Sequence, residues 1–356
     1  MEKLLVINPG STSTKIAVFE DTTKVLVETL RHDDETLEQF SWVCDQVDYR
    51  KGLIENCLRE KNIDIKTLTC IMARGGQLPP VPFGGYKVDQ QMVDCMLSIR
   101  AGAHASNVGC IIANAFAQEL SVPAYIYDPV SCDDLQPLAR ITGLKEVPKK
   151  SRGHALNSHA MATHCANNIL CRPITECTVI VVHLGGGCSV WLFDKGHAID
   201  MYSDDDAGFC PERCGRIQAL ELTHLCYSGK YTYEEMCKKV RGNAGFRELL
   251  GTSDVRTVEE RIQNGDEYAK LVYDAFLYST AKSVGDLAVA VRGKVDRIVI
   301  TGGIAHSKEV CRQMQAYLDW IAPVELLPGE FEMEALAEGG LRILRGEEEA
   351  KAVTYN

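Results

Sequence analysis

Strand-like and helix-like patterns follow one another along this chain in a definite order. Short runs rich in β-branched residues, separated by turn residues, open the sequence, and helical patterns with further short runs follow. The expected strands of this half span residues 3–7, 15–20, 24–30, 69–73 and 124–127, and the expected helices span 37–60, 89–99 and about 106–118. Three strands followed by alternating helices and strands predict a mixed sheet with helices packed on its faces.

The same order of patterns begins again near residue 177. A second set of three strand-like runs leads into helical segments, and one long segment carries its apolar residues on a single stripe. The expected strands of this half span residues 177–183, 188–194, 198–202, 297–301 and 324–327, and the expected helices include 266–291 and 332–345. The order of elements therefore predicts a second mixed sheet.

The two halves also match in pattern around their first hairpin. Residues 4–19 and 179–193 each consist of a strand, a turn of small residues and a second strand. The period of about 175 residues is far too long for a solenoid, so it predicts two similar domains that face each other. We expect an α/β protein with an N-terminal domain at 1–152, a second domain at 153–330 and a helical segment at 331–356 that returns to the N-terminal domain.

Composition and charge narrow the class of protein. A chain of 356 residues exceeds one ordinary core, and 46% hydrophobic with 24% charged residues is typical of a folded globular protein. The net charge of -11 argues against nucleic acid as a partner, because such a protein needs a basic face. No run is long and apolar enough for a signal peptide or a membrane span. The fifteen cysteines are scattered without a C-x-x-C pair, which favours a reducing cytoplasm.

Three turns are rich in residues that can surround a phosphate with backbone N–H groups and hydroxyls. They span residues 8–14, 183–189 and 301–305, and the first two occupy corresponding places in the two halves. None is a Walker loop, because no Gly-Lys-Ser/Thr opens a helix after it. Each turn alone is more often a plain connection. Together they favour a nucleotide held between two domains.

These turns and several other motifs carry a resemblance to a known family. The chain resembles the acetokinase family of the acetate and sugar kinase, heat-shock and actin superfamily, over nearly its whole length. The matching segments lie at 6–15, 73–76, 146–162, 183–187, 211–215, 252–256, 301–304 and 334–338. The overall length and residues 124–130 are similar to the butyrate kinases in particular. The resemblance implies two duplicated ribonuclease-H-like, or actin-like ATPase, domains with the active-site cleft between them.

The resemblance also implies a set of site residues for the nucleotide and its metal. Asn8 and Glu334 would assist Mg²⁺, and His183 with the three glycines after it would hold the β- and γ-phosphates. The implied phosphate- and nucleotide-binding residues are Ser11, Ser13, Thr14, Lys15, His183, Gly185, Gly186, Gly187, Asp254, Arg256, Gly302, Gly303 and Ile304. The implied cofactors are therefore ATP or ADP and Mg²⁺.

A second implied set handles the acid and the transferred phosphoryl group. Arg74 matches an arginine that binds the carboxylate, although its spacing to the following glycines is shorter than in acetate kinases. Asp128, His154 and Arg213 match the catalytic acid, the histidine that steadies the phosphoryl group and a second active-site arginine. His104 resembles another family histidine with a shift of one residue. Gly153 stands where acetate kinases carry Phe, so we expect a wider acyl pocket there.

Simpler interpretations of the same residues stay open at this point. Arg74 or Arg213 alone is more often part of a salt bridge, and His154 or His183 alone is more often a hydrogen-bonded structural histidine. The acidic run at 204–206 could hold a metal, but a solvated turn is the commoner case.

The expected activity is reversible transfer of the ATP γ-phosphoryl group to butyrate. The resemblance also implies a homodimer or a larger homo-oligomer. An acetate, propionate or branched-chain acid kinase is the nearest alternative. A sugar kinase and an actin-like ATPase scaffold are alternatives of other classes, and acid-dependent use of ATP separates them from the expected activity.

Overall fold

The computed structural model describes residues 1–99 and 104–355, and this part of the chain forms two compact units. The first unit contains Met1–Asp133 and the segment from Phe331 onward, and the second contains Asp134–Glu330. Residues 134–152, which we expected in the N-terminal domain, thus belong to the second unit. Their contacts explain this, because Gln136 N donates to Ile199 O (2.9 Å) and Lys149 Nζ lies 2.8 Å from an oxygen of Asp200.

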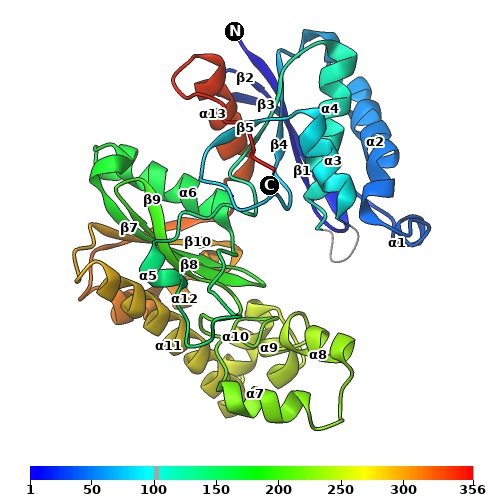
Figure 1. The fold of residues 1–356 in the computed structure, drawn as a ribbon. Helices are drawn as coiled ribbons and strands as arrows, with labels where there is room; N and C mark the ends of the chain where they lie inside the picture. Colours follow the sequence, from blue (N-terminus) through cyan, green and yellow to red (C-terminus); the bar gives the residue numbers. More distant parts are fainter. Residues whose placement is uncertain (100–103, 356) are drawn as a thin grey trace. The chain divides into compact units, whose positions relative to one another are not determined.

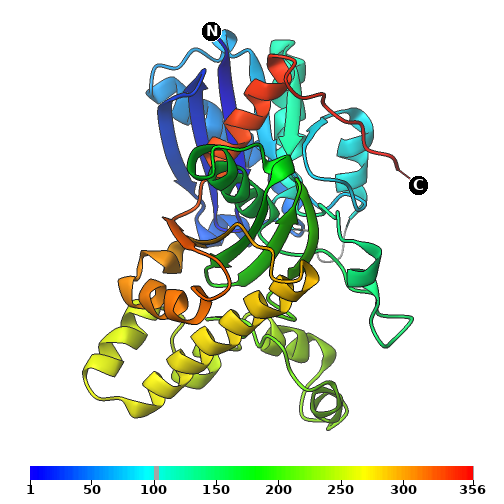
Figure 2. The same ribbon diagram turned by 90° about the vertical axis from the view of Figure 1, so that its left-hand side faces the viewer.

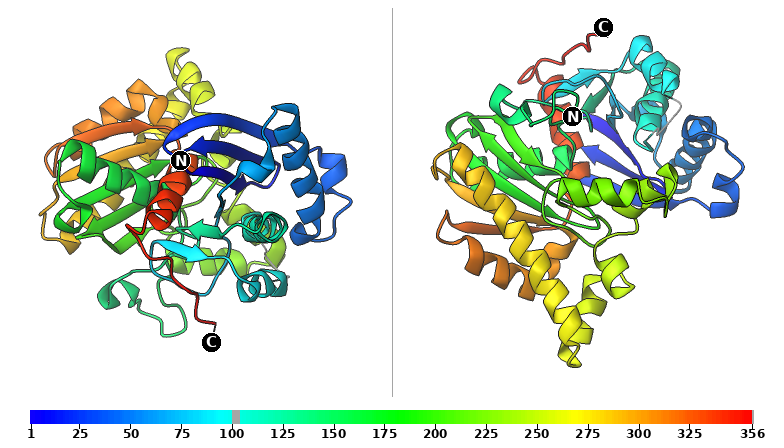
Figure 3. Two further views of the ribbon diagram at one scale, coloured as in Figure 1. Left: turned by 90° about the horizontal axis from the view of Figure 1, so that it is seen from above. Right: turned by 60° about the horizontal axis from the view of Figure 1, so that its bottom comes forward.

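The first unit is a six-stranded sheet with helices on both faces. Its strands are β1 (Lys3–Pro9), β2 (Ser13–Glu20), β3 (Thr23–Arg31), β4 (Cys70–Arg74), β5 (Gly85–Lys87) and β6 (Ala124–Tyr127), in the order β3-β2-β1-β4-β6-β5. Its helices are α1 (Asp34–Leu37), α2 (Val47–Glu60), α3 (Gln90–Ser98), α4 (Asn107–Leu120) and α13 (Glu332–Leu344). Helix α13 packs on β1, β4 and β6, while α4, flanked by α2 and α3, covers the other face (Figure 1; Figure 3, left).

The second unit repeats this plan with five strands. They are β7 (Thr178–Leu184), β8 (Cys188–Asp194), β9 (His197–Tyr202), β10 (Arg297–Gly302) and β11 (Val324–Pro328), in the order β11-β10-β7-β8-β9. Its helices are α5 (Pro137–Arg140), α6 (Ala155–His164), α7 (Ala219–Cys226), α8 (Tyr233–Val240), α9 (Phe246–Leu250), α10 (Val255–Gln263), α11 (Glu267–Ala290) and α12 (Lys308–Leu318). Helix α11, gold in Figure 2, runs along the sheet with α12 beside it, and α6 packs on β7 and β10.

The strand orders confirm the predicted duplication. Read from its antiparallel edge, the second sheet runs β9-β8-β7-β10-β11, which matches β3-β2-β1-β4-β6 in order and in strand direction. The register between the second and third strands is irregular in both units, after Val18 and after Leu192. The predicted α/β fold of two duplicated domains is therefore correct.

One local prediction was wrong, and one strand was missed. The helix expected at 37–60 is α2 alone, preceded by the short α1 and a 3₁₀ turn at Val43–Gln46. The break lies at Trp42, whose backbone is extended (φ -147°, ψ 145°) and whose Nε1 donates to Ile99 O (3.1 Å). The short strand β5 was not predicted, and it owes its place to pairing with β6 and to the Tyr86–Lys351 bridge.

The central strands β1, β7 and β8 are buried along nearly their whole length, as expected for strands covered by helices on both sides. All fifteen cysteines are free thiols. Among the helices of residues 1–99 and 104–355, none combines the length and the apolar character of a membrane span.

Candidate active site

The turn between β1 and β2 presents hydroxyls and backbone groups at one end of the first sheet. Gly10 N donates to Ser13 O (2.8 Å), which closes the turn, and Ser11 is exposed while Ser13 is half-buried. Thr14 differs from these two, because its hydroxyl is fully buried and lies 3.0 Å from Arg50 Nη1 and 2.9 Å from His32 Nε2. The expected phosphate contact is therefore available to Ser11 and Ser13, whereas the Thr14 hydroxyl is used inside the unit. Lys15 is half-buried on β2.

A buried carboxylate lies beside this turn, and it is Glu332. Its Oε2 lies 2.6 Å from Asn8 Nδ2 and 3.2 Å from Arg74 Nη1, and Glu332 is only 8% exposed. Glu334, to which the resemblance assigned the metal, instead forms an ion pair with Lys24 and is partly exposed. Both glutamates fall in the first turn of α13, so the sequence pattern alone could not choose between them.

Asp128 follows β6 directly and is buried. It has a positive φ of 40°, a conformation that Asp tolerates better than most residues. Its Oδ1 accepts a hydrogen bond from Gly84 N (2.8 Å), and its own N–H donates to Gly84 O (3.0 Å). Asp128 thus fixes the loop before β5. His104 is exposed, and its Nδ1 lies 2.7 Å from Ser106 Oγ.

Two histidines of the second unit stack on each other. The rings of His154, which precedes α6, and His183, in β7, have centroids 3.8 Å apart and an interplanar angle of 8°. His154 Nδ1 lies 3.0 Å from Ser189 Oγ, and His183 Nδ1 lies 3.0 Å from Nδ2 of the fully buried Asn157. Asn157 was not singled out from the sequence, although it belongs to the His154-Ala-Leu-Asn157 motif.

The glycine-rich turn after His183 lies against an arginine and a buried acid. Gly187 passes close to this acid, since a Cβ there would lie 2.8 Å from Asp204 Oδ2. Asp204 also lies 3.2 Å from Arg213 Nε and 3.3 Å from Arg241 Nη2. Burial raises the pKa of Asp204, and the positive charges of Arg241 and Arg213 act against that rise. Asp204 is therefore a salt-bridge partner of Arg213, and Asp206 caps a turn by accepting from Ser203 N (2.6 Å).

Gly153 lies where its chain passes close to β8 and β9. A Cβ added there would meet Ser189 Cβ and Met201 Cε at 3.0 Å and Trp191 Cζ2 at 3.1 Å. The space beside Gly153 is thus filled by side chains of its own unit. This differs from the open acyl pocket that we expected at this position.

A cavity of about 840 Å³ gathers three of the predicted nucleotide segments within the second unit. Gly186, the segment Ser253–Arg256 and the segment Gly303–Ile304 all line it. Asp254 caps α10 by accepting from Arg256 N (2.9 Å), and hydrogen bonds from Arg256 hold the pKa of Asp254 below its usual range. Gly302 has a φ of +91°, and a Cβ there would lie 2.3 Å from Leu184 O, so the turn after β10 requires glycine.

Charged side chains connect the loop that carries Glu212 and Arg213 with this cavity. Glu212, next to Arg213, forms an ion pair with Arg247, and Arg247 Nη2 lies 3.2 Å from Ser253 Oγ at the cavity wall. Glu212 N also donates to Gly186 O (3.1 Å). The second unit therefore brings the glycine-rich turn, Arg213 and the adenosine segments into one neighbourhood.

Comparison with known proteins assigns these motifs to a family. The model of the acetokinase family matches residues 145–323, about half of the chain. Butyrate kinase 1 of Clostridium acetobutylicum is 43% identical over 353 residues, which covers 99% of each chain. The chain belongs to the acetokinase family.

Solved structures of acetokinase-type enzymes have the same fold. The acetate kinase of Porphyromonas gingivalis gives a TM-score of 0.80 at 16% identity, covering 97% of this chain and 100% of that one. The propionate kinase of Francisella tularensis gives 0.74 at 18% identity, covering 95% and 99%. At such identities the likeness shows the fold alone.

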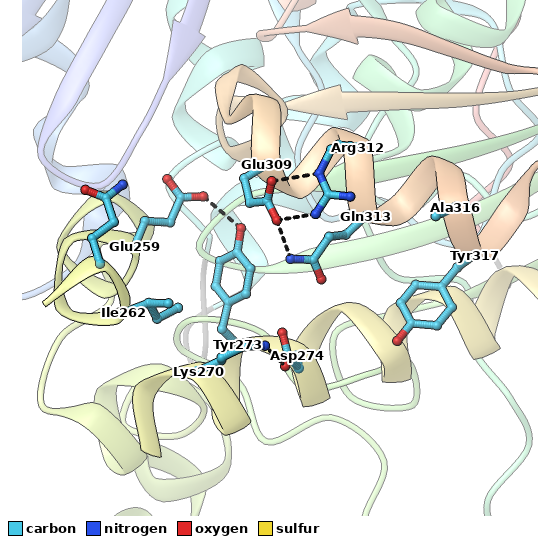
Figure 4. A pocket seen from close by; sticks show the side chains of 11 residues that line it. Glu259, Ile262, Lys270, Tyr273, Asp274, Glu309, Arg312, Gln313, Ala316 and Tyr317 are labelled. Atoms are coloured by element: carbon cyan, nitrogen blue, oxygen red, sulfur yellow. Dashed lines mark hydrogen bonds and ion pairs between the residues drawn. The ribbon is translucent and has the colours of Figure 1, made fainter. Parts of the chain in front are cut away.

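A second hollow, of about 780 Å³, lies beside the nucleotide segments of this acetokinase-family chain, and Glu259 and Glu309 line both. Figure 4 shows its side chains, which come from α10, α11 and α12. Tyr273 OH donates to Glu259 Oε1 (2.7 Å), and Glu309 lies 2.6 Å from Arg312 Nη2. These pairs hold Glu259 and Glu309 in place next to the cavity lined by Gly186, Ser253–Arg256 and Gly303–Ile304.

Proposed function

We propose that this chain transfers the γ-phosphoryl group of ATP to butyrate, forming butyryl phosphate and ADP, and catalyses the reverse reaction. The observation that carries this proposal is the 43% identity to a butyrate kinase over 99% of both chains, since such a match includes the whole site. The geometry of each unit supports it, because the motifs form one nucleotide cavity in the second unit and a polar turn with Arg74 in the first.

ATP would bind in the cavity of the second unit. Asp254, Arg256, Gly303 and Ile304 line the part for adenosine, and Gly186 brings the glycine-rich turn to the phosphates. Glycine residues allow backbone N–H groups to approach phosphate oxygens closely. His183, Gly185 and Gly187 belong to the same turn.

The acceptor chemistry needs positive charge more than it needs a base. A carboxylate is already ionised near pH 7, so no proton has to be removed from it. The obstacle is repulsion between the acid and the γ-phosphoryl group, and fixed donors that neutralise both lower it. Arg74, Arg213 and His154 are the residues that we assign to this task, with Asp128 on the acceptor side.

Mg²⁺ fits the donors beside the first turn. Mg²⁺ takes oxygen ligands, usually one or two carboxylates together with phosphate oxygens. Asn8 and the buried Glu332 supply an amide oxygen and a carboxylate next to Ser11 and Ser13, and so we propose Glu332 rather than Glu334 as the metal-assisting acid. The ion would neutralise charge on the phosphates, and Arg74 would be released from Glu332 toward the substrate carboxylate.

Other acceptors and other classes give different outcomes in one assay. Each buried CH₂ is worth about 0.8 kcal/mol, so two more than acetate would favour butyrate by about fifteen-fold in kcat/KM. An acetate, propionate or branched-chain acid kinase would show a different order of acids. A sugar kinase would need an alcohol, and an actin-like scaffold would turn over ATP with no acid dependence.

A homodimer or larger homo-oligomer and a cytoplasmic location also remain predictions.

The test is ADP formation with Mg-ATP and a panel of acceptors. We expect kcat/KM to rise from acetate to propionate to butyrate, and glucose to give only the background rate. Equal ADP formation with and without acid would contradict the proposal.

A further inference from the structure

Arg50 is a fully buried arginine beneath the turn between β1 and β2. It lies on α2, its exposed fraction is 0%, and the rest of that helix packs in the ordinary way with apolar residues inward. Arginine is almost never fully buried unless its donors are satisfied, because burial of a charge is costly. The position therefore needs an explanation beyond packing.

The guanidinium group donates both to the turn and to Gln46. Its Nη1 lies 2.9 Å from Gly10 O and 3.2 Å from Ser13 O, and its Nη2 lies 3.1 Å from Ser11 O. Nε and Nη2 lie 3.0 and 2.8 Å from Oε1 of Gln46, one turn earlier on the chain. Among the contacts that the structure describes for Arg50, none is to a carboxylate.

Each carbonyl from Gly10 to Ser13 accepts a hydrogen bond within the first unit, and three of the four accept one from Arg50. Gly10 O and Ser11 O accept from Arg50, Thr12 O accepts from His32 N (2.9 Å), and Ser13 O accepts from Gly10 N. Carbonyl oxygens repel phosphate oxygens, whereas N–H groups and hydroxyls attract them. Because its carbonyl oxygens already accept hydrogen bonds, the turn can present its donors to an anion. These donors include the accessible hydroxyls of Ser11 and Ser13.

We propose that Arg50 is a positioning residue for phosphoryl transfer, which holds the turn in its donor-presenting form and places an uncompensated positive charge beneath it. This inference rests on the proposed function, in which the turn contacts the transferred group. Burial lowers the pKa of Arg50 to about 10, so the group still carries its charge at neutral pH. A charge in a buried setting acts on neighbours more strongly than one in water.

A substitution at the neighbouring Gln46 can test the role of the Arg50 charge while the hydrogen bonds of Arg50 to the turn are kept. In Gln46→Glu a carboxylate oxygen replaces the amide oxygen that accepts from Nε and Nη2 of Arg50. The guanidinium group therefore keeps its acceptor, while the negative charge of the carboxylate cancels the net charge beneath the turn. We expect kcat to fall about tenfold with KM for ATP and butyrate within about threefold of wild type. The thermal unfolding midpoint should stay the same or rise. A purely structural role predicts unchanged kcat in this variant.

Arg50→Met removes both charge and donors, and it should lower kcat by at least about 10². Arg59→Met is the matched control, because Arg59 lies on the same helix, is exposed, and its Nη2 donates to Asn56 Oδ1 (2.6 Å). It should stay within about twofold of wild type.

The two proposals fail in different ways in this experiment. Wild-type protein without acid-dependent ADP formation would overturn the proposed function, whatever Arg50 does. Active wild type with an equally active, folded Gln46→Glu variant would overturn the role of Arg50. Should Arg50→Met not fold, Gln46→Glu still decides.

Discussion

The imidazole rings of His154 and His183 lie parallel at 3.8 Å, and the hydrogen bonds around them fix where each ring carries its proton. Ser189 Oγ lies within 3.3 Å of His154 N and 3.2 Å of Trp191 Nε1, so its own hydrogen is left for His154 Nδ1. The amide nitrogen of Asn157 can only donate, so His183 Nδ1 must accept. In the neutral form each ring then holds its proton on Nε2, and we interpret the pair as two Nε2–H donors for the phosphoryl group.

Arg213→Ala tests the assignment of the second active-site arginine. We expect kcat to fall by at least about 10³ while KM for ATP changes by a few-fold, because the group acts mainly in the transition state. Arg241→Ala is the control, since Arg241 shares Asp204 but is 47% exposed, and we expect a loss of at most about tenfold. Steady-state kinetics of both variants decide, and an Arg213→Ala enzyme with more than a tenth of wild-type kcat would refute the role.

The Mg²⁺ requirement of two variant enzymes distinguishes the roles of Glu332 and Glu334. Glu332→Gln should raise the Mg²⁺ concentration for half-maximal activity by about 10- to 100-fold, because a buried carboxylate beside Asn8 is lost. Glu334→Gln should leave it nearly unchanged, since that side chain only pairs with Lys24 at the surface. Mg²⁺ titrations of the two variants measure this. A larger effect of Glu334→Gln than of Glu332→Gln would instead assign the metal to Glu334.

The two glutamates illustrate what the sequence could and could not predict. Alternation and β-branched residues sufficed for the strands, so that β8 and β6 have the predicted bounds. The duplicated hairpins were enough for the fold class. The choice between Glu332 and Glu334 depends on how α13 packs on its sheet. A short motif in the sequence does not specify this packing.

Arg50 shows the same limit more strongly. On an amphipathic helix an arginine is usually exposed, and only the packing of α2 against the β1–β2 turn buries it. Gly153 is a third case, since the sequence showed a missing side chain but could not show that Trp191 and Met201 fill the space. In each case the deciding contact joins residues far apart along the chain.

Gly153→Ala should destabilise the protein without changing its preference among acids. The added Cβ would crowd Ser189, Met201 and Trp191, and such overpacking typically costs about 1–3 kcal/mol. The measurements are the free energy of unfolding and the ratio of kcat/KM for butyrate to that for acetate. A ratio that shifts more than about threefold would show that Gly153 sets chain length after all.

His32 should make the first unit sensitive to mild acid. Burial, with a further effect of the positive charge of Arg50, lowers the pKa of His32 from its ordinary value of 6.5 to about 4. Between these values the unfolded chain binds a proton that the folded chain does not, so stability falls as the pH drops from about 6.5 toward 4. Urea unfolding at several pH values should show a smaller loss in His32→Gln than in wild type. Equal losses would mean that His32 is not responsible.

The most direct test of the whole account is to identify the product. Protein, Mg-ATP, butyrate and hydroxylamine are incubated together, and any acyl phosphate is trapped as butyryl hydroxamate, with butyrate omitted in the control. The account predicts hydroxamate in proportion to the ADP released, and none without butyrate. ADP release with no hydroxamate would contradict transfer to the carboxylate.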